Sequence, residues 1–271
     1  MRERAARMGS AVVVLAVVVR AVVVLAVVVF LAFAFAFAGP AAADTTGRYA
    51  LEMSGERYGL VVLKPAPAQL VVSTQEVPRP LVTLLTGFAS GKPVKRDVRL
   101  SSGAVIRKTK DARLVAVHLP QLGAGGAPEV ELAFTAAPLT TQPLLSVSAK
   151  ESSPPPASAR ITTFRIEVAG IPTVAAPKLD AITLTQKPDG TVTTGVVGFE
   201  AGAGGAPPFA AWQKANGEHP APRTVKIEYV AADGAAILEL QLERCMPTEV
   251  VPQGANGTTR IAMTCGGVRA R

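Results

Sequence analysis

Alternation of apolar and polar residues at a period of two is the feature that most restricts how this chain can fold. It recurs in residues 49–53, 130–134, 164–168 and 225–229. Because successive side chains of a β-strand point to opposite faces of a sheet, the pattern predicts strands with one buried face. The predicted fold class is therefore mainly β (α+β).

Helices and turns complete this prediction. Short helices are expected chiefly at residues 80–88 and 208–215. The step Ala232-Asp233-Gly234-Ala235 separates two alternating runs, and its Asp-Gly pair has the chemistry of a tight hairpin turn.

The N-terminal segment differs from the rest of the chain. Residues 1–7 carry three arginines, the 18 residues 21–38 are all apolar, and residues 41–43 are alanines. A charged start, an apolar stretch and small residues are typical of a signal peptide, with cleavage expected after Ala43. The apolar run is also just long enough to cross a hydrocarbon core of about 30 Å, so an uncleaved membrane anchor is the alternative. Either way, the folded part is expected outside the cytoplasm: secreted, periplasmic or at the cell surface.

A boundary is expected in the middle of the mature chain. Residues 146–159 are rich in Pro and Ser, lose the alternation and contain three consecutive prolines, as an extended linker does. The predicted organisation is a signal peptide or anchor at residues 1–43, one β domain at 44–145, the linker, and a second β domain at 160–271.

The two halves also resemble each other. Residues 49–55 and 164–170 share the pattern aromatic, any residue, aliphatic, Glu, aliphatic, small, Gly. The segments 80–86 and 208–214 each begin with a Pro, and they lead to Gly91 and Gly217 respectively. Two matches in the same order suggest a duplication. Chance likeness between small β domains of similar composition is the alternative.

A series of weak motifs runs through the second half. It begins with the strand and turn at residues 164–172, continues with the Trp-containing segment 208–217 and the basic strand and Asp-Gly turn at 223–234, and ends with the hairpin formed by 238–249 and 259–265. In this order the motifs resemble the tail-tube proteins of contractile phages and the related tubes of type VI secretion systems. The first half repeats the series more faintly, over residues 47–139.

This resemblance implies two tandem β-barrel or β-sandwich domains, each with a short flanking helix. Members of the family stack as six-fold rings into a tube, so a tandem chain would form a ring from three copies. The expected function is that of an exported, non-enzymatic structural or assembly protein that acts through protein–protein surfaces. Its expected partners are proteins, including further copies of itself. Contact with a membrane is expected only through the N-terminal segment, if that segment is not cleaved.

A secreted β-sandwich module that binds a carbohydrate or another cell-surface ligand is the alternative function. Sugar sites usually expose aromatic rings on which the sugar stacks. The chain has one Trp and three Tyr, and Trp212 is better interpreted as the core anchor of the second helix.

Residues that could carry chemistry are sparse. The only histidines are His118 and His219, and neither has a Cys or carboxylate at ligand spacing, so no metal site is predicted. His118 is interpreted as a half-buried strand residue. No nucleophile elbow, phosphate loop or dinucleotide motif is present, so no catalytic residue and no cofactor are predicted. The net charge of +8 does not indicate nucleic-acid binding, because the basic cluster Arg107–Lys110 has no aromatic residue beside it.

The two cysteines fall on the last expected hairpin, where a Cys245–Cys265 disulfide is the default in an oxidising compartment. Strand alternation argues in part against the bond. Leu238, Leu240 and Leu242 mark the core face and place Cys245 on the opposite one. A bulge near Pro247 would bring Cys245 back to the core face, so the sequence leaves the pairing open.

Overall fold

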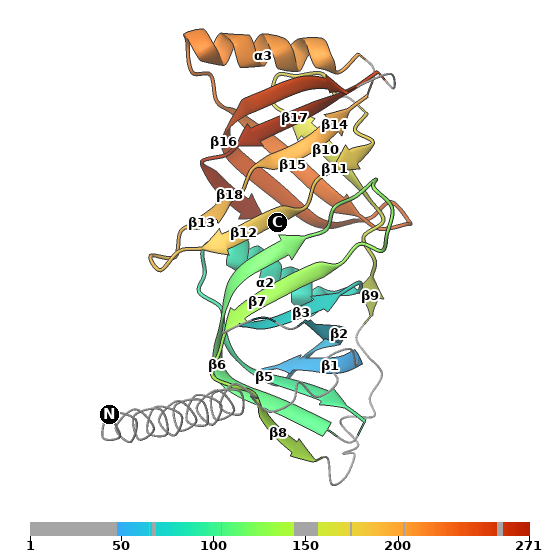
Figure 1. The fold of residues 1–271 in the computed structure, drawn as a ribbon, viewed down its shortest axis with the longest axis vertical. Helices are drawn as coiled ribbons and strands as arrows, with labels where there is room; N and C mark the ends of the chain where they lie inside the picture. The colour runs from blue at the N-terminus through green and yellow to red at the C-terminus, as the bar shows by residue number, and fades with distance from the viewer. Residues whose placement is uncertain are drawn as a thin grey trace, which may run out of the picture. The chain divides into compact units, whose positions relative to one another are not determined.

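The computed structural model describes residues 48–64, 66, 69–103, 105–143, 157–173, 175–202, 204–253 and 257–271. These residues are mainly in strands and include two α-helices (Figure 1), which confirms the predicted mainly β class. The described residues all belong to one compact unit. The expected signal peptide or anchor at residues 1–43 lies outside the described part.

Six antiparallel strands from the first half close into a barrel. Their order is β6-β5-β1-β2-β3-β7, and β7 pairs back onto β6. The strands are β1 (Arg48–Met53), β2 (Glu56–Lys64), β3 (Leu70–Thr74), β5 (Lys95–Ser102), β6 (Val105–Leu119) and β7 (Val130–Thr135). A further strand, β8 (Thr140–Pro143), pairs with the beginning of β6.

Strand alternation fills the interior of this barrel. In β1, Tyr49, Leu51 and Met53 are buried, whereas the residues between them are not. Helix α2 (Arg79–Ala89) has a proline in its first turn, where the missing N–H costs no helical hydrogen bond. It buries its apolar side, including Leu81 and Phe88, in the same core.

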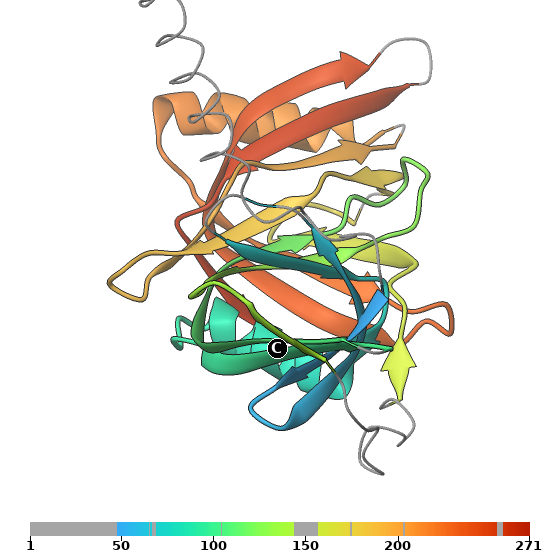
Figure 2. The ribbon, with the colours of Figure 1, turned by 60° about the horizontal axis from the view of Figure 1, so that its bottom comes forward.

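A second sheet is built from the second half and does not close. Its order is β10-β15-β16-β17-β14-β11, and β18 pairs with β16. Its strands are β10 (Thr163–Val168), β11 (Lys178–Leu179), β14 (Val197–Ala201), β15 (Arg223–Val230), β16 (Ala236–Gln253), β17 (Thr258–Thr264) and β18 (Gly267–Ala270). Helix α3 (Ala206–Glu218) packs against β16 and β17, as Figure 2 also shows. The Asp233-Gly234 turn joins β15 to β16, as predicted.

The two sheets share an order of strands. The series β1-β5-β6-β7-β3 in the first corresponds to β10-β15-β16-β17-β14 in the second. In both, a helix precedes the strand that pairs with the longest one, because α2 precedes β5 and α3 precedes β15. The sheets differ at the outer edge of the first strand of the series: β2 covers this edge of β1, whereas no described strand covers the corresponding edge of β10.

A hairpin from the second half joins the first sheet. Strand β12 (Ile182–Gln186) pairs with the end of β6, and β13 (Val192–Thr194) pairs with β12. The Gln186 Nε2 donates a hydrogen bond of 3.1 Å to the carbonyl oxygen of Gly91, just after α2. A single buried apolar cluster includes residues of both halves.

The expected linker lies mostly outside the described residues. Its last part, β9 (Ser158–Ala159), pairs with β4 (Val77–Pro78). The division into two domains at residues 146–159 stays a prediction.

Candidate assembly surface

The outer edge of β10 is a strand edge that no described strand covers. β10 pairs along its other edge with β15, from Thr163 opposite Val230 to Val168 opposite Val225. The inner face of β10 is apolar, since Ile166 and Val168 are buried in the core. Its outer face carries Arg165 and Glu167, both exposed. The strand therefore offers unpaired backbone groups between an apolar and a charged face.

A network of opposite charges covers the outer face of the sheet beside this edge. The Arg165 guanidinium lies 3.3 Å from the Glu228 carboxylate. The Lys226 ammonium lies 2.7 Å from Glu228 and 3.3 Å from Glu239. Hydrogen bonds that Lys226 donates to these two carboxylates raise the pKa of Lys226, and the bond that Glu228 accepts from Lys226 lowers the pKa of Glu228. The pairs lie at the surface and remain partly accessible to solvent, so they fix side-chain positions more than they stabilise the fold.

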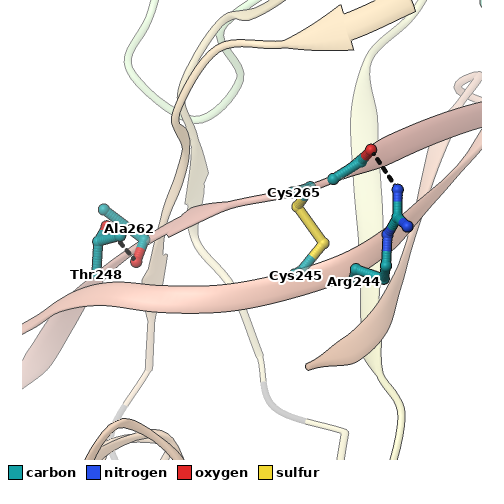
Figure 3. Close-up of a disulfide and its surroundings, with 6 residues drawn as sticks. Arg244, Cys245, Thr248, Ala262 and Cys265 are labelled. Carbon is teal, nitrogen blue, oxygen red and sulfur yellow. Dashed lines mark hydrogen bonds between the residues drawn. A yellow bond between two sulfur atoms is a disulfide. The ribbon is translucent and has the colours of Figure 1, made fainter. Parts of the chain in front are cut away.

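The structure pairs Cys245 and Cys265 in a disulfide between β16 and the end of β17 (Figure 3). Cys245 is fully buried because the alternation of β16 changes at Arg244, whose φ is +51°. This change lies before Cys245, whereas the sequence placed the expected bulge near Pro247. A second irregularity does occur in the pairing between Pro247 and Glu249.

Two hydrogen bonds flank the disulfide in Figure 3. The Arg244 Nη2 donates to the carbonyl oxygen of Gly266 at 2.9 Å, and the Thr248 Oγ1 donates to that of Ala262 at 3.2 Å. The disulfide and these hydrogen bonds link β16 to β17 close to the residue where the alternation of β16 changes.

Trp212 lies on the inner side of α3 and is 2% exposed. Its indole Nε1 donates a hydrogen bond of 2.9 Å to the carbonyl oxygen of Ala221. The Arg223 guanidinium lies 5.4 Å from the centre of its ring system, and Phe209 packs beside it. These contacts attach α3 to the start of β15.

A second cluster of charged and polar side chains lies on the outer face of the first sheet. The Lys64 ammonium lies 2.6 Å from Glu131 and 3.4 Å from Glu129, and Gln75 donates to Glu129 at 3.4 Å. Partial burial opposes ionisation of Glu129, but Gln75 and Lys64 together lower its pKa. For Lys64, the bond and charge of Glu131 outweigh the effect of burial and raise the pKa. These contacts favour the ionised form of Glu129.

The histidines lie apart from each other. The His118 Nδ1 is 2.9 Å from the Thr183 Oγ1 across the β6–β12 pair. An irregularity in the pairing of β6 between Leu114 and Ala116 interrupts the alternation, so Leu114 is buried and His118 is half-buried. His219 is exposed at the end of α3. Within the described ranges, no three His, Cys, Asp or Glu side chains come together as metal ligands would.

A search of protein-family models and of curated protein sequences finds no match to the chain. Neither of the helices in the described ranges is both long and apolar enough to cross a membrane.

Proposed function

We propose that the chain is an exported, non-enzymatic assembly protein that joins protein partners, including copies of itself, through the open edge of its second sheet. One observation carries the proposal: the first sheet closes into a barrel, whereas the second ends at β10 with its outer edge uncovered by any described strand. Open edges promote pairing with other chains unless they are protected. The chain already uses such pairing internally, where β12 of the second half adds to β6 of the first.

The common strand order of the two sheets supports the proposed duplication, which the likeness to tail-tube proteins implies for this chain. Five strands and one helix follow the same order in each half. A tandem chain of this kind would supply two of the six positions in a ring, so a ring would need three copies.

Export is the other part of the proposal. It is supported by the charged start and apolar run at residues 1–38. The Cys245–Cys265 disulfide supports it as well, because structural disulfides persist mainly in oxidising compartments.

The carbohydrate-binding alternative receives less support. All three tyrosines, Tyr49, Tyr58 and Tyr229, and the one tryptophan, Trp212, are at most 4% exposed. A stacking platform for a sugar ring needs an exposed aromatic face, and none of these side chains provides one.

The solution mass of the exported protein tests the proposal. The protein, purified from the export compartment of a bacterial host with its disulfide intact, is measured by light scattering on a sizing column over a wide concentration range. We expect dimers or larger assemblies, and electron microscopy then shows whether rings or tubes form. A strict monomer at every concentration would contradict self-assembly.

A further inference from the structure

We propose that two copies of this chain pair through their β10 strands, antiparallel and centred on Ile166, so that their second sheets join into one. The inference rests on the proposed assembly function and names its first partner, a second copy, and the register of the contact. This contact is two-fold and closes at a dimer, so a three-copy ring would need an additional head-to-tail contact.

The backbone of β10 determines which residues can pair outward. The Ala169 N–H donates to the Thr224 carbonyl oxygen of the neighbouring strand β15 at 2.9 Å. In an antiparallel ladder every second residue bonds to the same neighbour. The odd-numbered residues of β10 therefore face β15, and the backbone groups of Phe164, Ile166 and Val168 face the open edge. The Val168 carbonyl oxygen also accepts a bond of 3.0 Å from the Ile171 N–H.

A second copy of the same edge fits these groups. When the pairing is centred on Ile166, this residue lies opposite itself, and Phe164 lies opposite Val168 of the second copy. The outward-facing backbone groups of both strands then meet. Moving one strand by a single residue would bring outward-facing groups opposite inward-facing ones, so such registers lose the ladder.

Side chains select this register among those that remain. Arg165 of each copy lies directly opposite Glu167 of the other on the outer face, which places two opposite-charge pairs across the contact. On the inner face, Phe164 meets Val168, and Ile166 meets Ile166, so apolar side chains oppose one another. A shift of two residues would place Arg165 opposite Arg165, or Glu167 opposite Glu167.

Other open edges in the described residues fit a second chain less well. β11 and β13 have two and three residues, and β8 ends in a proline, which lacks an N–H. The part of β16 beyond Cys245 contains Pro247 and Pro252, and Gln213 of α3 donates to its Thr248 carbonyl oxygen. β10, with six residues and no proline, is the edge best suited to pairing.

Mixed cross-linking tests the register. Two populations of the exported protein are prepared with the native disulfide intact, one with Arg165→Cys and one with Glu167→Cys. Directly opposite residues in a pair without mutual backbone hydrogen bonds lie about 4.5 Å apart at Cα, within the range of a disulfide. We expect a reducible dimer when the two populations are mixed under mild oxidation, and little or none with either alone. Cross-linking of Arg165→Cys chains with one another would contradict the register.

Charge exchange separates contact between copies from effects within one copy. Arg165→Glu and Glu167→Arg should each weaken the dimer about tenfold, because like charges then face each other twice. The double variant restores opposite charges between copies, so we expect it to recover most of the affinity. Within one chain the double variant places a carboxylate beside Glu228 and a guanidinium beside Lys226. If the single variants weakened the dimer only through contacts within one chain, the double variant would therefore weaken it further.

The outcomes distinguish this inference from the proposed function. If light scattering shows assemblies but the mixed cysteine variants do not cross-link, the β10 contact is overturned and self-assembly is retained. A monomer in both experiments would overturn both, and the charges of β10 would then serve to protect its edge.

Discussion

At the scale of single residues, we predict opposite changes in stability when two buried tyrosines are replaced by Phe. The Tyr229 hydroxyl is buried among apolar side chains without a hydrogen-bond partner in the described structure, and burial raises its pKa. Replacing Tyr229 with Phe removes an unsatisfied buried group, so we expect the free energy of unfolding to rise by about 1 kcal/mol. Urea unfolding at pH 7 measures the change.

Tyr58 is the matched control. Its hydroxyl donates a hydrogen bond of 2.9 Å to Glu56, and burial followed by Glu56 raises its pKa to about 12. Tyr58→Phe loses this bond and should lower stability by about 1 kcal/mol. Equal losses in the two variants would mean that the Tyr229 hydroxyl has a partner.

The same residues predict the response to alkaline pH. In the unfolded chain a tyrosine ionises near pH 10, whereas the folded protein keeps both hydroxyls protonated to higher pH. Above about pH 10 the unfolded state therefore binds fewer protons, and stability falls as pH rises. We expect a smaller fall in Tyr229→Phe than in the natural protein, measured as unfolding free energy between pH 9 and 11. An equal fall in both would contradict the raised pKa.

The disulfide makes a prediction at the scale of elements. Cys245 and Cys265 are separated by 20 residues, and closing a loop of this size stabilises a fold by about 3 kcal/mol in the chain-entropy model. Replacing both cysteines with Ala should lower the unfolding free energy by about this amount. Reductant should destabilise the natural protein similarly and leave the double variant unchanged. A reductant effect on the variant would indicate a cause other than this bond.

Elements also differ in how far the sequence predicts them. Local alternation and the Asp233-Gly234 turn are sufficient to predict β1, β10 and the β15–β16 hairpin, because neighbouring residues alone determine which face of each strand is buried. The change of buried face at Arg244 depends on a positive φ at this residue, which the alternation of apolar and polar residues does not predict. The pairing of β12 with β6 depends on residues far apart in the chain, for which no local pattern exists.

The molecule as a whole should unfold in one step despite its two predicted domains. The β12–β13 hairpin joins the first sheet, and one buried cluster includes both halves. Loss of either half would therefore expose apolar surface of the other, which makes separate unfolding costly. Trp212, the only tryptophan, reports on the second half, whereas circular dichroism reports on all strands.

We expect the two signals to change at the same urea concentration. Leu184, 1% exposed in β12, lies opposite Val117 of β6, so Leu184→Asp should weaken the junction. Its expected effect is that tryptophan fluorescence and circular dichroism separate into two transitions. Thr193→Asp on β13 is the control: Thr193 is only half-buried, and this variant should keep a single transition. Two transitions already in the natural protein would mean instead that the halves fold independently and that the β6–β12 contact contributes little.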